Sequence, residues 1–210
     1  MSETLNAQWA NAWIKGCAVA AAEHREELID LDRAIGDADH GENIDRGFGE
    51  VVKKLEETPA DTPAAVLKLT AQTLISKVGG ASGPLYGTAF LRAAKAIDTD
   101  ELTAADVARL IAGAVEGITA RSKAKEGEKT MVDAWAPAAA AAAKAAEEGQ
   151  SPAQTLAAAA AAAEEGAQNT IDMVATKGRA SYLGERSAGH KDPGAASTAY
   201  FLRAAATAAQ

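Results

Sequence analysis

Three aspartates stand close together in one glycine-containing segment of the sequence. Asp32, Asp37 and Asp39 lie within eight residues, and His40 and Asn43 come soon after them. Carboxylates this close repel one another unless a cation offsets their charge. Asp32 also lies near the end of a predicted helix, where the helix dipole disfavours negative charge. These two costs favour a site for a hard divalent cation over a solvated acidic turn.

An EF-hand calcium loop is the first alternative for this segment, and its pattern is not met. If Asp37 takes the first position of the loop, Gly41 takes the fifth, where a ligand is needed. Phe48 then takes the twelfth position, where a bidentate glutamate is needed. Mg²⁺ held by a few carboxylates, with substrate phosphates completing its coordination, fits the segment better.

A second segment, residues 79–84, reads GGASGP and leads into a predicted helix. Backbone amides in a glycine-rich turn and at a helix N-terminus bind anions, phosphate above all. The alternative is an ordinary turn that ends one helix and starts the next. The sequence contains neither a GxxxxGK[ST] motif nor a GxGxxG motif after a strand, so a nucleotide site here would be of another kind.

Two further segments, 121–130 and 176–194, carry basic residues and also interrupt the helical pattern. Their polar residues are Lys123, Lys125, Lys129 and Thr130 in the first, and Lys177, Arg179, Arg186, His190, Lys191 and Asp192 in the second. Single basic residues are usually solvated. Metal-binding carboxylates, an anion-binding turn and Arg or Lys are, however, the parts of a phosphoryl-transfer site when they lie together.

The composition predicts an all-α protein. Apolar residues make up 48% of the 210 residues, aromatic residues only 4%, and Ala is abundant, which favours helices over strands. The apolar periodicity and the N-cap signals Thr62, Thr103 and Ser151 predict about eight helices. They cover 4–30 and 42–57, start at 62, after 84, at 103, near 130 and at 151, and end with 195–208.

Short connections make successive helices antiparallel neighbours. We therefore expect an eight-helix up-and-down bundle or closed barrel that forms a single domain over residues 1–210. Alternate connections in such a bundle lie at the same end. The four unusual segments follow the first, third, fifth and seventh helices, so they should meet at one rim and form one site.

The net charge of −8 and the single cysteine limit the possible function classes. An acidic chain is not expected to bind nucleic acid or an anionic membrane over a broad face, although a small polyanion could bind with local help. Cys17 cannot form an internal disulfide and is expected in the core. The sequence predicts neither a signal peptide nor a membrane span, so a cytoplasmic location is expected.

Four stretches of the chain resemble the signatures of one family, in the same order. They are LDRAIGDADHGENIDRGF, SKVGGASGPLYGTAFLRAAKA, EKTMVDAW and KGRASYLGERSAGHKDPGA. With them the whole chain resembles the ADP-binding L subunits of bacterial dihydroxyacetone kinases of the phosphoenolpyruvate-phosphotransferase-dependent type. The resemblance implies an eight-helix barrel, here one L-type nucleotide-binding domain, with the nucleotide at one rim.

The resemblance also implies roles for particular residues. Asp32, Asp37 and Asp39 correspond to aspartates that hold two Mg²⁺ ions against the phosphates of ADP or ATP. The implied nucleotide contacts are His40, Gly41, Glu42, Asn43, Ala81, Ser82, Ser122, Thr130, Met131, Arg179, Asp192, Pro193 and Gly194. Ser122 stands where related sequences often have Gly, which would leave a backbone contact in place. Arg179 is also assigned a catalytic role in offsetting phosphoryl charge, no general base is assigned, and the role of His190 is open.

In the family that the chain resembles, the L subunit is active only with partners. A K subunit binds dihydroxyacetone covalently. In one branch ADP stays bound and is rephosphorylated by a phosphohistidine on an M subunit, and the product is dihydroxyacetone phosphate. In the other branch the L module is fused to the K module and uses ATP. The chain carries no K module, which favours the first branch.

Two alternatives are kept. One is the L subunit of an ATP-dependent kinase for dihydroxyacetone or a related small sugar. The other is an ADP-loaded regulatory or interaction module without phosphoryl transfer.

Overall fold

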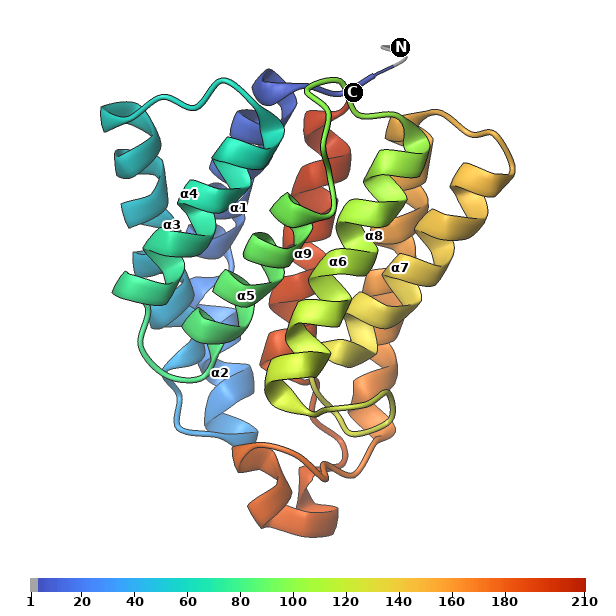
Figure 1. Cartoon of the computed structure of the whole chain (residues 1–210). Coiled ribbons are helices and arrows are strands. Elements are labelled where there is room, and N and C mark those ends of the chain that lie inside the picture. Colours follow the sequence, from blue (N-terminus) through green and yellow to red (C-terminus); the bar gives the residue numbers. More distant parts are fainter. Residues whose placement is uncertain (1–3) are drawn as a thin grey trace.

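The computed structural model describes residues 4–210 and is helical throughout (Figure 1). Its only β-type pairing in that range is an isolated bridge between Leu5 and Leu102. The α-helices are α1 (Ala7–Glu23), α2 (Arg25–Ile35), α3 (His40–Glu57), α4 (Pro63–Lys77), α5 (Ser82–Lys95), α6 (Ala104–Ser122), α7 (Val132–Glu147), α8 (Pro152–Asn169) and α9 (Pro193–Ala208). Two 3₁₀ helices, η1 (Thr170–Asp172) and η2 (Arg179–Ser187), lie between α8 and α9. The all-α prediction is confirmed.

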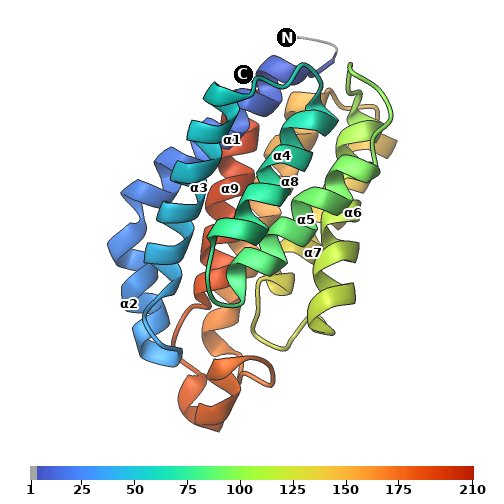
Figure 2. The ribbon, with the colours of Figure 1, turned by 60° about the vertical axis from the view of Figure 1, so that its left-hand side comes forward.

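Eight of these helices form a closed ring over the described part of the chain. Helices α3 to α9 each pack against the next in sequence, and α1 packs against both α3 and α9, which closes the barrel. The view turned by 60° shows the same antiparallel arrangement (Figure 2). The predicted up-and-down barrel is therefore confirmed, with α2 as a further short helix.

The prediction of one first helix over 4–30 is wrong in its details. The structure has two helices there, which meet at His24, where ψ is 11° instead of the usual α-helical value. The His24 ring stacks on Tyr200 of α9 with centroids 3.8 Å apart, and its Nδ1 lies 2.9 Å from Glu27. This contact from a distant part of the chain accompanies the break, and α2 then packs on α3 and η2.

The helix starts follow the predicted caps. Thr62 accepts a hydrogen bond from Ala65 N, and Thr103 and Asp106 form a complete capping box. Ser151 and Gln154 form a second capping box. Three starts come earlier than expected, because α3 begins at His40, α5 at Ser82 and α9 at Pro193.

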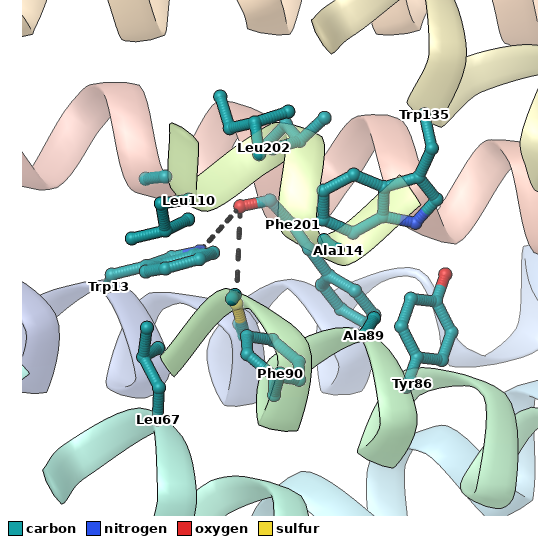
Figure 3. Packing of buried hydrophobic residues seen from close by; sticks show 14 of the residues in the cluster. Trp13, Leu67, Tyr86, Ala89, Phe90, Leu110, Ala114, Trp135, Phe201 and Leu202 are labelled. Atoms are coloured by element: carbon teal, nitrogen blue, oxygen red, sulfur yellow. Dashed lines mark hydrogen bonds between the residues drawn. The ribbon is translucent and has the colours of Figure 1, made fainter. Parts of the chain in front are cut away.

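Aromatic side chains fill the inside of the barrel (Figure 3). The largest buried ones are Trp13, Trp135, Tyr86, Phe48, Phe90 and Phe201. The Trp13 indole donates to Phe201 O at 2.9 Å, and the Trp9 indole donates to Ala205 O at 3.1 Å. Cys17 is fully buried beside them, as expected. The interior is thus a packed core, and the site must lie at an end of the barrel.

The connections divide between the two ends. The loops α2–α3, α4–α5, α6–α7 and α8–α9 lie together at one end, which we call the rim, and the last of these protrudes furthest (Figures 1 and 2). The other connections lie at the opposite end, with the start of the described chain and the C-terminus. None of the described helices is long and apolar enough to cross a membrane.

Close contact between α7 and α8 depends on Gly166. A Cβ there would lie 2.1 Å from Asp133 O and 2.9 Å from Pro137 Cγ. We expect Gly166→Ala to lower the free energy of unfolding by about 1–3 kcal/mol, because the two helices must move apart. A Cβ added at Gly49 would meet no other described part of the chain within 4 Å, so Gly49→Ala should be neutral or stabilising by up to about 1 kcal/mol. Urea unfolding of both variants checks this, and equal stabilities would contradict it.

Candidate functional site

One pocket at the rim is lined by residues from all four of its connections. The lining residues include Asp32, Gly36, Asp37, Asp39 and His40 from the first, Gly80, Ala81 and Ser82 from the second, Lys129, Thr130 and Met131 from the third, and Lys177, Gly178, Arg179, Asp192, Pro193 and Gly194 from the fourth. The expected meeting of the four segments is therefore confirmed.

The three aspartates of the first connection are arranged as metal ligands would be. One carboxylate oxygen from each of Asp32, Asp37 and Asp39 lies within 4.8 Å of the others. Burial raises the pKa of Asp39, and the negative charge of Asp37 raises it further. Hard oxygen ligands with mutual repulsion fit a divalent cation such as Mg²⁺, which would remove that repulsion.

Asp32 is held in place by the start of α3. Its Oδ2 accepts hydrogen bonds from Asp39 N at 2.8 Å and His40 N at 3.1 Å, at the helix end where a negative charge is favourable. Gly36 makes the tight turn possible, since a Cβ there would lie 2.1 Å from Asp32 Oδ1. The unfavourable interaction of Asp32 with the C-terminal end of the α2 dipole is thus offset by the N-terminal amides of α3.

Arg179 supplies positive charge beside this cluster. Its Nη2 lies 2.8 Å from Asp37 Oδ2, and its side chain is two-thirds exposed. The α8–α9 connection therefore carries a guanidinium across to the acidic loop. An exposed ion pair of this kind is weak, so Arg179 can exchange Asp37 for another anion at little cost.

The glycine-rich turn lies next to the aspartates. Gly80 has a φ of +66°, and a Cβ there would lie 3.5 Å from Asp39 and from Asn43. Ala81 and Ser82 follow in the pocket wall, at the start of α5. Among the described residues, no side chain caps this helix. Its first amides are the type of donor that binds phosphate.

The third connection differs from expectation at Lys129. Lys129 borders the pocket, but it is only 1% exposed, and its ammonium donates to the backbone carbonyls of Thr170, Ile171 and His190. The sequence groups Lys129 with basic residues that could offset phosphate charge, and in the structure its ammonium is instead bonded to these carbonyls. Thr130 and Met131 do line the pocket, and Asp133 fixes their loop by accepting from Thr130 N at 2.7 Å.

His40 is buried under the pocket. Its Nε2 lies 2.9 Å from Ser197 Oγ, which lies 2.6 Å from Tyr86 Oη. Burial lowers the pKa of His40 to about 4, so the ring is neutral near pH 7. A neutral, hydrogen-bonded imidazole suits a contact residue better than a general base.

Asp192 forms the far wall of the pocket at the start of α9. Its Oδ2 accepts from Ala195 N at 2.8 Å, and its own amide donates to Thr170 Oγ1 at 2.9 Å. Burial raises the pKa of Asp192 to about 7. Pro193 and Gly194 continue the wall and are the first residues of α9.

Four of the residues expected at the site lie outside this pocket lining. Gly41 packs against Arg25, whose carbonyl oxygen would lie 2.2 Å from an added Cβ, and Glu42 is exposed. Asn43 lies under the glycine-rich turn and accepts from Arg46 at 2.6 Å. Ser122 lines an adjoining pocket that shares Ala81 and Met131 with the first. Their roles stay predictions.

The structure adds residues that sequence reasoning did not assign. Gly178 has a positive φ in the pocket wall, and its only sequence signal is a glycine in a polar loop. Ile35 and Ala180 form a small buried cluster with Ala175, which fastens the α8–α9 connection to α2. Apolar residues in a loop give no pattern from which this contact could be predicted.

Comparisons with known proteins agree on one family. The model of the DAK2 domain matches residues 34–207. The chain is 45% identical over 199 residues to the ADP-binding subunit DhaL of the PEP-dependent dihydroxyacetone kinase of Escherichia coli (strain K12), covering 94% of this chain and 95% of that protein. It is 44% identical over 203 residues to the corresponding subunit of dihydroxyacetone kinase 1 of Listeria innocua, covering 96% of both.

A longer relative and a solved structure extend the comparison. The L-erythrulose 1-kinase of Mycolicibacterium smegmatis is 35% identical over 187 residues, and the match spans 32% of its length. The crystal structure of the dihydroxyacetone kinase of C. freundii with AMP-PNP and Mg²⁺ matches 94% of this chain and 33% of its own, with a TM-score of 0.69 and 24% identity. At that identity the likeness shows a shared fold.

We expect Asp37→Asn to weaken binding of Mn²⁺, used as a probe for Mg²⁺, by at least about tenfold, because one charged oxygen ligand is lost. Asp30→Asn is the matched control, since Asp30 is an exposed aspartate of the preceding helix α2 and, among the described residues, forms its ion pair with Arg33. Titration calorimetry on both variants checks this. Equal affinities in the two variants would contradict the metal assignment.

The buried His40 makes stability depend on pH. Its pKa is about 4 when folded and about 6.5 when unfolded, so its contribution is fully present above pH 6.5 and is lost as pH falls toward 4. Between pH 7.5 and 5 this contribution should fall by up to about 2 kcal/mol. His40→Gln should lack that part of the pH dependence. Urea unfolding of both proteins at the two pH values checks this. The prediction is contradicted if His40→Gln loses as much stability between pH 7.5 and 5 as the wild type does.

Proposed function

The chain belongs to the DAK2 domain family, and we propose that it is the nucleotide-binding subunit of a dihydroxyacetone kinase. In this proposal the rim pocket holds ADP with Mg²⁺. A phosphohistidine on an M subunit rephosphorylates the nucleotide, and dihydroxyacetone on a K subunit takes up the phosphoryl group. The observation that carries the proposal is the meeting of an acidic cluster, a glycine-rich turn and Arg179 in one pocket. The names of the relatives that match nearly the whole chain support it.

Asp32, Asp37 and Asp39 would hold the metal. Their oxygens are close enough to share a cation, and their mutual repulsion needs one. Two Mg²⁺ ions are part of the proposal, and bound Mg²⁺ supplies neutralising charge for the phosphate oxygens. Asp32 is fixed by two amides of the α3 start, whereas Asp37 is held only by Arg179. Asp37 is therefore freer than Asp32 to move onto an ion.

The pocket walls suit the two parts of a nucleotide. The glycine-rich turn and the start of α5, with Ala81 and Ser82, offer amides to the phosphates. The adjoining pocket is more apolar and is lined by Leu85, Ala124 and Met131, together with Ser122. We assign the phosphates to the first pocket and the nucleoside to the second, since aromatic bases favour apolar walls.

Arg179 would act on the reacting phosphoryl group. It lies at the rim surface, beside the aspartates, on a connection that reaches over the pocket. Its guanidinium offers planar donors for phosphate oxygens and can offset charge that grows during transfer. Its exposure leaves the guanidinium within reach of a group that a partner brings to the rim.

No residue of this chain is assigned as the general base. His40 is buried, neutral near pH 7 and bonded to Ser197. Asp32, Asp37 and Asp39 are assigned to the metal, and Asp192 is buried and accepts from Ala195 N at the start of α9. The proton of the acceptor hydroxyl would therefore pass to a group on the K subunit. The cytoplasmic location expected from the sequence is also part of this proposal.

The first experiment is to purify the protein from cells, denature it and identify any released nucleotide by chromatography. About one ADP per chain that survives gel filtration in Mg²⁺ is expected, because a resident nucleotide must stay bound between turnovers. Asp37→Asn, prepared in the same way, should release much less ADP. An empty wild-type protein that binds ATP weakly and turns over with a K partner would favour the ATP-dependent alternative. A wild-type protein that binds no nucleotide would contradict the proposal.

A further inference from the structure

Lys129 is a buried lysine whose ammonium is fully used by the backbone. The side chain is 1% exposed, and Nζ donates to Thr170 O, Ile171 O and His190 O. An ammonium has three protons, so these three acceptors satisfy it. Such burial is unfavourable without partners, and the backbone also takes the uncommon φ of +60° at this residue. A residue that only filled space in the loop would require neither a buried ammonium nor a positive φ.

The three carbonyls belong to the two ends of one segment. Thr170 and Ile171 begin the stretch between α8 and α9, residues 170–192, which we call the rim segment, and His190 lies near its end. Two backbone contacts reinforce the junction, because Gly189 N donates to Ile171 O at 2.7 Å and Asp192 N donates to Thr170 Oγ1 at 2.9 Å. Lys129 thus joins both ends of the rim segment at one point.

The rim segment carries two of the residues that define the pocket. Arg179 reaches from it to Asp37 at 2.8 Å, and Asp192 closes the wall at its end. Away from this junction, the described part of the segment is held by a small apolar cluster of Ala175, Ala180 and the partly buried Leu183 with Ile35 of α2, and by the hydrogen bonds of Ala175 N to Ser187 Oγ and Thr176 N to Glu128 O. A fixed base is therefore needed to keep its guanidinium over the acidic loop.

The charges around Lys129 are consistent with this arrangement. Burial lowers the pKa of Lys129, and the carboxylates of Asp192, Asp172 and Asp133 act in the opposite direction. Two of these acids, Asp192 and Asp172, belong to the rim segment itself. The attraction therefore draws the segment toward Lys129 in addition to the hydrogen bonds.

We infer that Lys129 is a positioning residue that fastens both ends of the rim segment and thereby places Arg179 and Asp192 at the pocket. The placement of the segment stands on the contacts above. Its consequence for ADP rests on the proposed function. The two parts can be tested separately, because the segment can be measured in nucleotide-free protein.

The test compares Lys129→Met with Lys123→Met. Lys123 is a matched control, since it lies in the same connection, has a φ of +56° and is exposed. In nucleotide-free protein, amide hydrogen exchange at Gly189 and Asp192 should become at least about tenfold faster in Lys129→Met, while amides of α1 and α5 stay as in the wild type. Lys123→Met should match the wild type throughout. ADP dissociation in Mg²⁺ should also become at least about tenfold faster in Lys129→Met alone.

A second measurement needs no variant, in case Lys129→Met does not fold. In the wild-type protein the ¹⁵N-labelled ammonium of Lys129 should give a slowly exchanging NMR signal with contacts to Thr170, which the exposed Lys123 cannot give. Absence of that signal would overturn the inference. Wild-type exchange at Gly189 and Asp192 in Lys129→Met would do the same, as would faster exchange spread evenly over α1 and α5. If neither the wild type nor the variants bind ADP, but exchange at Gly189 and Asp192 is faster in Lys129→Met, the proposed function fails and the positioning role stands.

Discussion

Closure of the helical ring is the constraint on which the rest of this structure depends. Each helix of the ring runs antiparallel to its neighbours, and α1 meets α9, so alternate connections must lie at the same end. The aromatic core fills the inside of the ring with buried side chains. Four loops that are far apart in sequence then share one rim, and in the described part of the chain they do so without a β-strand to bring them together. The meeting of these four loops follows from the closure of the ring.

The rim also shows how an acidic chain can offer a place for a polyanion. The net charge of −8 opposes such binding at long range. In the proposed site, the guanidinium of Arg179, glycine-containing backbone and a cation shared by the carboxylates would offset this charge locally. Specific placement of a few groups would then outweigh the charge of the whole chain. A broad binding face for nucleic acid, which needs many such groups, has no counterpart in the sequence.

Much of the fold and part of the site followed from local sequence signals. Thr62, Thr103 and Ser151 predicted helix starts because N-caps act within a single turn. The alternation of loops predicted that Asp37, Ala81, Thr130 and Arg179 would meet, and they line one pocket. The roles assigned to Gly41, Glu42, Asn43 and Ser122 came from a family resemblance, and the shape of the pocket alone does not decide them.

Other features depend on contacts that no local pattern records. The break at His24 goes with a ring contact to Tyr200 on the last helix. In the sequence, Lys129 is one of several loop lysines. In the structure, its ammonium bonds to carbonyls of Thr170 and His190, which lie 41 and 61 residues further along the chain. The burial that makes His40 neutral likewise comes from Ser197 and its neighbours. Residue type suggested a chemistry in each case, and only tertiary packing decided the charge state or the direction of the side chain.

The pairing of the first and last ring helices has a mechanical consequence. The start of α1 and the end of α9 lie at the end of the barrel opposite the rim (Figure 1), and the two helices are joined by the Trp9 bond to Ala205 and, one turn further in, the Trp13 bond to Phe201. A force that pulls the start of α1 away from the end of α9 would break these two hydrogen bonds one after the other. In a shear geometry both bonds would carry the load together. We therefore expect the barrel to unfold at low force, starting at the end opposite the rim and reaching the rim loops last.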